Sequence, residues 1–251
     1  MKHTHNHEIV GEVVYYNDYF SHYLNNHRTI IVWLPPSYHN EHHRRYPVLY
    51  MHDGQNVFDP TTSFAGNDWR LDETVSGLIK EDKLEEIIIV AIYNTNDRLK
   101  EYSVSEHGKK YINFIAHELK FFIDDTFRTK PTPEQTAVMG SSMGGLISLY
   151  ACWSEPKIFG KCAALSTSFW HNNEAMIKLL TSDKSKKRPI QIYLDSGDDS
   201  KYDTQKVFCI LTQKGYNIGD ELDYYFDRGA DHNESAWANR LYRPLLFFFG
   251  K

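Results

Sequence analysis

Short apolar runs alternate with amphipathic or polar stretches along most of this chain. Runs of about four to eight apolar residues are typical of strands. Seven runs stand out, at residues 29–34, 48–51, 87–92, 136–139, 162–165, 190–194 and 222–226. The run at 87–92 is continuously apolar, which predicts a strand buried on both faces. Strands that alternate with helical stretches indicate an α/β fold around a largely parallel sheet.

Three segments have the spacing of helices. Residues 110–127 place Ile112, Ile115 and Leu119 on one face, which predicts an amphipathic helix that covers the sheet. Residues 146–153 follow a glycine-rich turn, and residues 236–249 form an apolar closing helix. A chain of 251 residues without repeats fits one large domain. We therefore expect a single α/β domain over residues 1–251, with residues 1–8 disordered.

Composition and charge narrow the class of protein. The formal net charge of -5 provides no basic face for nucleic acid, so we expect no nucleic-acid partner. No run approaches the roughly 18 apolar residues that span a bilayer, and residues 1–8 lack the apolar region of a signal peptide. We expect a cytoplasmic protein without membrane association, or a secreted one if a signal peptide had been removed. The three cysteines are too scattered for a disulfide framework or a zinc site.

The hexapeptide Gly-Ser-Ser-Met-Gly-Gly at 140–145 carries the clearest chemical signal. It contains Gly-x-Ser-x-Gly, in which small residues let a strained serine sit on a sharp turn between a strand and a helix. By itself the pattern is also that of a glycine-rich turn with a serine helix cap. Because an apolar strand precedes it and a helix follows it, the context favours Ser142 as a nucleophile.

A serine nucleophile needs a base, and in chains with this turn the partners follow in the order serine, acid, histidine. Of the 13 histidines only His171 and His232 come after Ser142. His171 follows the run at 162–165, whereas His232 lies in a polar loop between the last strand and the closing helix. His232 is therefore the expected general base, and a histidine that caps the helix is the alternative interpretation.

The acid is expected just after the run at 190–194, where the sequence offers Asp195, Asp198 and Asp199. Asp195 is expected to belong to the strand itself. Asp198 and Asp199 follow the glycine turn, and we favour Asp199, with Asp198 the next choice. Two alternatives stay open: both carboxylates merely solvate a turn, or a Ser-His pair works without an acid.

Acyl transfer also needs two N–H donors aimed at the developing oxyanion. The expected donors are the backbone N–H of Met143, the residue after the nucleophile, and the backbone N–H of Gln55 in the loop that follows residues 48–51. An ordinary turn is the rival interpretation of the Gln55 loop. Trp69 and Trp170 are loop residues that could line an acyl or aryl pocket, although aromatic packing under loops explains them equally well.

Several segments together resemble the putative esterase family of α/β hydrolases. They are His-Asp-Gly-Gln-Asn at 52–56, the hexapeptide at 140–145, the segment 229–237 around His232, and an Arg-x-x-Glu-Tyr segment at 98–102. The resemblance extends from about Glu12 to the end of the chain. The family includes feruloyl and acetyl-xylan esterases, enterochelin-type esterases, S-formylglutathione hydrolases and mycolyltransferases. In that family the acid often stands at the position of Ser200 here, which is a departure.

The resemblance implies the α/β-hydrolase fold, with a mostly parallel eight-stranded sheet flanked by helices. It implies a serine-dependent carboxylic ester hydrolase that forms an acyl-enzyme on Ser142 and acts on a small-molecule ester. No organic cofactor or metal is required by this chemistry. His3, His5 and His7 alternate, as the ligands of a divalent metal on an extended segment would, but a disordered terminus is the better interpretation.

Three rival functions are distinct from hydrolysis. An acyltransferase would use the same three residues but exclude water from the acyl-enzyme. A binding protein would keep the fold without turnover, although the intact Ser142 and His232 argue against it. A metal-dependent hydrolase is disfavoured because no His-Glu-x-x-His motif is present.

Overall fold

The computed structural model describes residues 9–185 and 187–251, and the expectations for residues 1–8 fall outside this part of the chain. Its centre is an eight-stranded sheet with the order β1-β2-β4-β3-β5-β6-β7-β8. The strands are β1 (Glu12–Ser21), β2 (Asn26–Leu34), β3 (Val48–His52), β4 (Ile88–Ile92), β5 (Thr136–Ser141), β6 (Lys161–Leu165), β7 (Gln191–Ser196) and β8 (Leu222–Phe226). β1 pairs antiparallel with β2 and β2 with β4, whereas the pairs from β4 to β8 are parallel.

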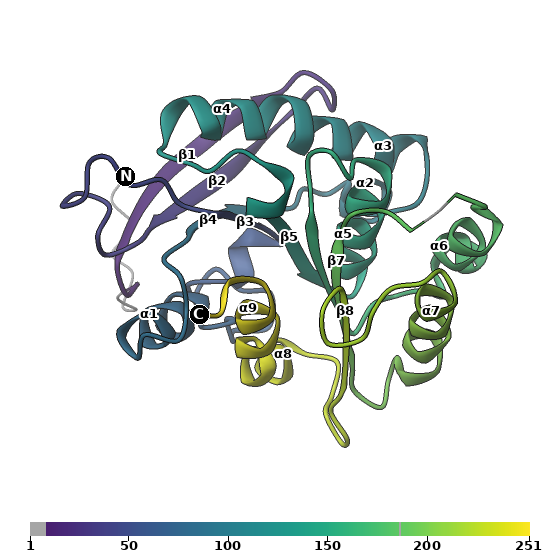
Figure 1. Cartoon of the computed structure of the whole chain (residues 1–251). Coiled ribbons are helices and arrows are strands. Elements are labelled where there is room, and N and C mark those ends of the chain that lie inside the picture. Colours follow the sequence, from purple (N-terminus) through teal and green to yellow (C-terminus); the bar gives the residue numbers. More distant parts are fainter. Residues whose placement is uncertain (1–8, 186) are drawn as a thin grey trace.

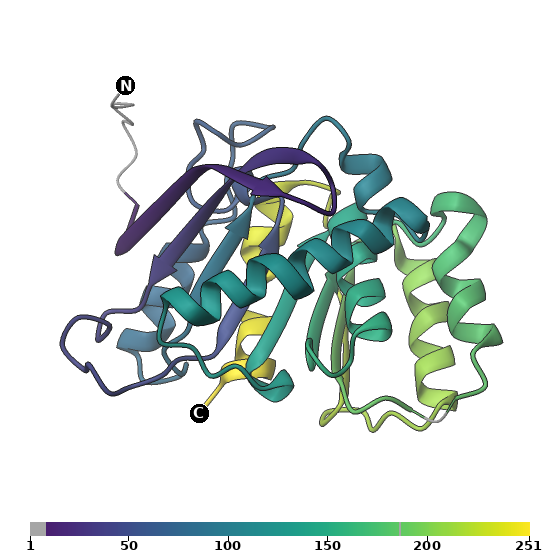
Figure 2. The ribbon, with the colours of Figure 1, turned by 90° about the horizontal axis from the view of Figure 1, so that it is seen from above.

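Helices cover both faces of this sheet (Figures 1 and 2). The helices are α1 (Leu71–Lys80), α2 (Arg98–Glu101), α3 (Glu106–Asn113), α4 (Lys120–Thr126), α5 (Met143–Ser154), α6 (His171–Ser182), α7 (Lys201–Gln213), α8 (Glu234–Arg240) and α9 (Tyr242–Phe249). A π-helical segment, Phe114–Leu119, joins α3 to α4. Helices α3 to α7 pack on one face, and α1, α8 and α9 pack on the other.

The strand residues divide between two apolar layers because successive side chains point to opposite faces. In β3, Val48 and Tyr50 belong to the layer under α3 to α7, while Leu49 and Met51 belong to the layer under α1, α8 and α9. β3, β4, β5 and β6 are buried along their whole length. Burial on both faces accounts for their continuous apolar runs. Because these strands are parallel, their carboxyl ends lie along one edge of the sheet.

The predicted α/β-hydrolase architecture and its mostly parallel sheet are confirmed. Each of the seven apolar runs coincides with a strand of the sheet, although Ile87 and Ile190 precede β4 and β7 by one residue. The closing segment 236–249 is two helices that meet at Leu241 rather than one. Pro244 lies in the first turn of α9, where a missing N–H costs least, so it suits the start of a new helix.

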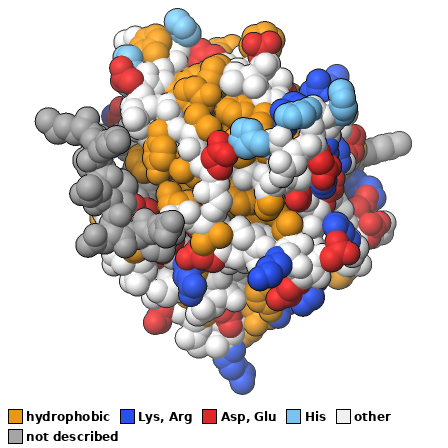
Figure 3. Space-filling view, turned by 90° about the vertical axis from the view of Figure 1, so that its left-hand side faces the viewer, with side chains coloured by type: hydrophobic (Ala, Val, Ile, Leu, Met, Phe, Trp, Pro, Cys, Tyr) orange, Lys and Arg blue, Asp and Glu red, His pale blue; other side chains and the backbone are white. Residues whose placement is uncertain are grey.

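One side of the molecule carries a hydrophobic groove near the first described residues. Its volume is about 480 Å³, and its apolar lining includes Val10, Trp33, Pro36 and Ile79. Figure 3 shows hydrophobic side chains gathered on this side among charged ones. In the described part of the chain, no helix combines the length and apolar character that crossing a membrane requires.

Candidate active site

Ser142 lies on a sharp turn between β5 and α5. Its backbone has φ 56 and ψ -120, a strained conformation for a residue other than glycine. A Cβ on Gly140 would stand 2.7 Å from the backbone of Gly144, so the turn closes this tightly only with glycine there. The N–H of Ser142 donates to the carbonyl of Leu165 on the neighbouring strand at 2.9 Å. The predicted strand, turn and helix are therefore confirmed.

A second serine, Ser168, contacts Ser142. Their Oγ atoms are 3.0 Å apart and share a hydrogen bond in which either can donate. The backbone N–H of Ser168 also donates to the carbonyl of Ser142 at 3.2 Å. Ser168 follows β6, the neighbour of β5, so the parallel sheet brings both serines to the same edge. The sequence analysis did not single out Ser168, although its place just after an apolar run was the available signal.

His232 and Asp199 meet across neighbouring loops. His232 Nδ1 is 2.5 Å from Asp199 Oδ2, a short hydrogen bond between the loop after β8 and the loop after β7. With Nδ1 donating to the carboxylate, the imidazole keeps Nε2 as its free nitrogen. The edge of the ring packs against Trp237, with ring centroids 5.0 Å apart. The structure thus brings together the favoured base and the favoured acid.

Asp198 and Asp195 have other contacts. Asp198 Oδ2 accepts the backbone N–H of Gly229 at 2.9 Å, which ties the two loops together. Asp195 belongs to β7, is fully buried and lies 3.0 Å from Nε of Arg240. Burial raises the pKa of Asp195 to about 6, against the opposing effect of Arg240. Arg240 also donates to Ser166 Oγ at 2.7 Å, so this buried group holds α8 against the ends of β6 and β7.

Ser142 and His232 border one cavity of about 550 Å³. Gln55, Phe64, Glu234 and Trp237 are also among its lining residues. A cavity of this size fits a small-molecule ligand. A strained serine and a carboxylate-bound histidine therefore face the same cavity.

Of the two residues expected to supply N–H donors, Gln55 lines this cavity, and Met143 directly follows Ser142, which lines it. Met143 is the first residue of α5, so its N–H has no partner inside the helix and lies at the positive end of the helix dipole. Gln55 lies in the 3₁₀ turn Gly54–Asn56 that directly follows β3. A Cβ on Gly54 would stand 2.6 Å from the backbone of Ala91 and Ile92, so glycine lets this turn pack closely on β4. The Gln55 side chain accepts the N–H of Asn94 at 3.3 Å.

An ion pair supports the Gln55 turn from behind. Arg98 donates from Nε and Nη2 to the two oxygens of Asp53, both at 2.7 Å, and Asn94 donates to the same carboxylate at 2.6 Å. Burial lowers the pKa of Arg98, but the hydrogen bond and charge of Asp53 outweigh this effect and raise it. The Tyr102 hydroxyl accepts the N–H of Asp53 at 3.2 Å. The Arg-x-x-Glu-Tyr segment thus supports the turn.

Two further residues near the Gln55 turn, Glu101 and His52, are deeply buried. Glu101 forms a fully buried ion pair with Arg28 at 2.7 Å. His52, at the end of β3, is 2.9 Å from the Tyr111 hydroxyl through Nδ1. Burial lowers the pKa of His52 to about 4, so it is neutral at pH 7. His52 supports the turn from inside the protein.

The structure places Trp69 and Trp170 away from the surface of this cavity. Trp69 is only 2% exposed because its ring packs under Trp237, with centroids 5.7 Å apart. Trp170 is 65% exposed and packs beside His171. Among the described residues the tryptophan that lines the cavity is Trp237. Trp69 therefore lies behind the cavity wall, where it contacts Trp237 and donates its backbone N–H to Asn56 at 2.8 Å.

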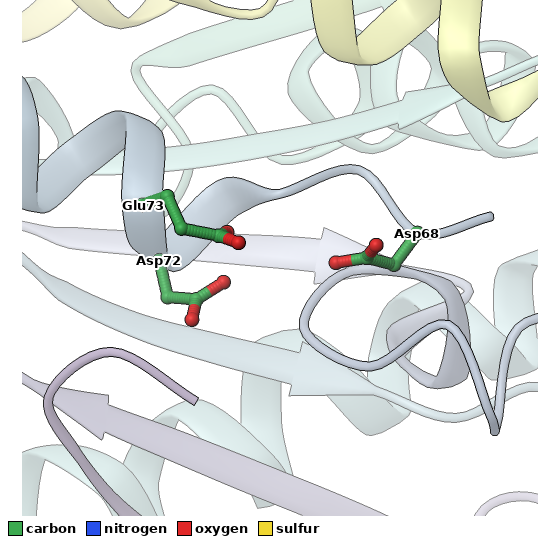
Figure 4. Close-up of side chains that lie close together, drawn as sticks. All are labelled: Asp68, Asp72 and Glu73. Atoms are coloured by element: carbon green, nitrogen blue, oxygen red, sulfur yellow. The ribbon is translucent and has the colours of Figure 1, made fainter. Parts of the chain in front are cut away.

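Three carboxyl groups gather at the start of α1, in the segment around Trp69. Figure 4 shows Asp68 in the preceding loop and Asp72 and Glu73 in the first turn. Their oxygens lie within 4.8 Å of one another. Burial first, and then the hydrogen bond and charge of Glu73, raise the pKa of Asp72 to about 7, while Asp72 Oδ2 accepts the N–H of Val10 at 2.7 Å.

The fold and the strained serine turn define a protein of the α/β-hydrolase class. The sequence model of the family described as Putative esterase matches residues 21–248, nearly the whole chain. The chain therefore belongs to this family of esterases, and it is a carboxylic ester hydrolase.

Individual proteins are also similar to this chain in sequence or in structure. The Bacillus subtilis protein YbbA is 25% identical over 239 residues, which cover 89% of this chain and 93% of that protein. A solved ferulic acid esterase is 21% identical, with a TM-score of 0.78 over 96% of this chain and 99% of its own. The enterobactin esterase FES of Shigella flexneri is 18% identical, with a TM-score of 0.77 over 96% of this chain and 59% of its own. At these identities the two structures show the shared fold.

Proposed function

We propose that Ser142, His232 and Asp199 form a catalytic triad that hydrolyses carboxylic esters through an acyl-enzyme. The observation that carries the proposal is the 2.5 Å contact between His232 and Asp199 beside a cavity that His232 shares with Ser142. Serine alone is a poor nucleophile, so the carboxylate-oriented imidazole supplies the missing base.

In the first half-reaction, Ser142 Oγ forms a bond to the ester carbonyl carbon while its proton passes to His232 Nε2. Asp199 stabilises the charged imidazole through Nδ1. The N–H groups of Met143 and Gln55 stabilise the negative charge that develops on the carbonyl oxygen. The carbon–oxygen ester bond then breaks, and His232 returns its proton to the leaving alcohol.

In the second half-reaction, water replaces the alcohol. His232 takes a proton from the water molecule, the resulting hydroxide bonds to the acyl carbon, and Ser142 leaves with the proton from His232. The His232 side chain is 40% exposed, so water reaches the base directly. This exposure favours hydrolysis over acyl transfer to another alcohol.

The test compares wild type with Ser142→Ala on p-nitrophenyl acyl esters and on methyl ferulate. The account predicts that the variant keeps the wild-type circular dichroism and loses turnover by on the order of 10³-fold or more. Ser168→Ala is the matched control, because it removes a neighbouring hydroxyl that has no role as nucleophile. Substantial turnover by folded Ser142→Ala would remove Ser142 from the mechanism.

A further inference from the structure

Glu234 is a largely buried residue on the wall of the active-site cavity. It is the first residue of α8, two residues after His232, and its exposure is 8%. It lines the same cavity as Ser142 and His232. Across residues 9–185 and 187–251, no hydrogen-bond or ion-pair partner reaches its side chain. Because no group in the described part of the chain pairs with this carboxylate, a positively charged ligand in the cavity can supply the partner.

Two of the other charged groups that line the cavity neutralise each other. Asp53 and Arg98, which both line it, form a two-bonded ion pair at 2.7 Å, and their charges cancel. The Asp199 carboxylate binds His232 Nδ1 and adds a further negative charge behind the imidazole. Glu234 thus adds a negative charge without a partner among the described residues to the wall of the cavity that Ser142 borders. A positively charged group bound there is attracted, and an anionic group is repelled.

Aromatic side chains add to this preference. Trp237 follows Glu234 by one helical turn on the buried side of α8 and also lines the cavity. Phe64 lines it as well and is 92% exposed. An alkylammonium group is attracted both to a carboxylate and to the face of an aromatic ring. The protein's net charge of -5 attracts cations over longer distances in the same sense.

We propose that Glu234 makes this hydrolase selective for esters that carry a positive charge on the alcohol portion. The inference rests on the proposed function, in which His232 protonates the leaving alcohol. Glu234 lines the same cavity as His232, so our proposal assigns the alcohol side of the ester to Glu234. Glu234 is a specificity-determining residue, and its carboxylate takes no part in bond breaking.

The test uses three butyryl thioesters that differ in the charge of the leaving group. Butyrylthiocholine is cationic, the ester of 2-mercaptoethanol is neutral, and the ester of 3-mercaptopropionate is anionic. Thiol release is followed with a disulfide dye, and kcat/KM is compared for wild type, Glu234→Gln and Asp231→Asn. Asp231 is the matched control because it is an exposed carboxylate in the same loop.

We expect wild type to prefer the cationic over the anionic thioester. Glu234→Gln should lower the ratio of the two kcat/KM values by roughly tenfold, mainly through KM, because an unscreened charge at close range is removed. Asp231→Asn should change the ratio by less than about twofold because solvent and salt screen an exposed charge. Added salt should reduce the wild-type preference and leave that of Glu234→Gln nearly constant.

Four results would overturn the inference, and the last of them would also overturn the proposed function. An equal shift of the ratio in Glu234→Gln and Asp231→Asn would mean that general surface charge sets the preference. A lower melting temperature of Glu234→Gln with no change in the ratio would mean that Glu234 only stabilises the start of α8. Ser142-dependent turnover with an unchanged ratio would contradict this inference alone. The absence of Ser142-dependent turnover for all three thioesters would contradict the proposed function and this inference together.

Discussion

At the scale of single residues, Asp198 and Asp199 are neighbours that make different contacts. Asp199 touches His232 Nδ1, whereas Asp198 accepts the N–H of Gly229. A carboxylate on Nδ1 fixes the tautomer of the imidazole and stabilises its charged form during the reaction. A carboxylate on a backbone N–H positions a loop. The two residues should therefore differ in what their loss does to activity.

Asp199→Asn should lower kcat by on the order of 10³-fold or more, because an amide can present the wrong tautomer to His232 and carries no charge. Asp198→Asn should lower kcat by less than about tenfold, because the amide oxygen still accepts from Gly229. Steady-state hydrolysis of p-nitrophenyl butyrate measures both. A larger loss for Asp198→Asn would assign the acid role to Asp198, and two mild losses would indicate a Ser-His pair.

The residue scale is also where prediction from the sequence reached its limit. Ser142, His232 and Asp199 could be proposed from the sequence because the order of the strands that carry them fixes their order along the chain. Trp69 and Trp237 could not be distinguished, because both are tryptophans in or near loops and only packing decides which one faces the cavity. Glu234 gave no signal, since its burial depends on how α8 docks on the sheet.

At the scale of elements, α5 packs unusually close to the sheet. A Cβ on Gly145 would stand 2.4 Å from Thr167 Oγ1 and 3.1 Å from the backbone nitrogen of Leu165. Thr167 is short and fully buried, so it cannot move aside easily. The glycine that follows the serine turn thus lets the helix approach β6 and keeps Ser142 at the sheet edge.

Gly145→Ala should lower the free energy of unfolding by about 1–3 kcal/mol because of this overpacking. Gly77→Ala is the control: Gly77 lies within α1 with nothing within 4 Å of the added Cβ. That substitution should raise the free energy of unfolding by about 0.5–1 kcal/mol, since alanine favours a helix. Urea titrations of both variants measure the difference. Equal effects of the same sign would show that Gly145 is not confined by its neighbours.

Elements differed in how well their sequence patterns revealed them. The inner strands were predictable because burial on both faces requires continuous apolar runs. β1 was not among the predicted strands because its buried and exposed residues alternate irregularly, with a register shift between Tyr16 and Tyr19. The helix over 110–127 was predicted, but it begins at Glu106 and contains a π-helical segment. The apolar spacing fixes the buried face of a helix better than its ends.

At the scale of the whole molecule, ionisation of buried groups links stability to pH. An aspartate in an unfolded chain has a pKa of about 3.9, whereas that of Asp72 in the folded protein is about 7. Between these values the folded state holds a proton that the unfolded chain releases. The contribution of Asp72 to stability is therefore present below pH 4 and is lost as the pH rises to about 7.

Asp72→Asn removes this titration, and the amide oxygen can still accept the N–H of Val10. The free energy of unfolding of the variant, minus that of wild type, should therefore increase between pH 4 and pH 7 and stay level above pH 7. Urea titrations at closely spaced pH values provide the measurement. A difference that is constant with pH, or that decreases as the pH rises, would mean that Asp72 is ionised in the folded protein.

The most direct test of the account is covalent capture of the nucleophile by an uncharged alkyl fluorophosphonate. A reactive serine oxygen bonds to phosphorus, fluoride leaves, and the product is stable enough for peptide mapping by mass spectrometry. The account predicts one adduct per chain on Ser142, loss of ester hydrolysis in proportion to labelling, and no adduct in Ser142→Ala. An adduct on Ser168 or any other residue, or full hydrolysis by the labelled protein, would contradict the assignment of Ser142.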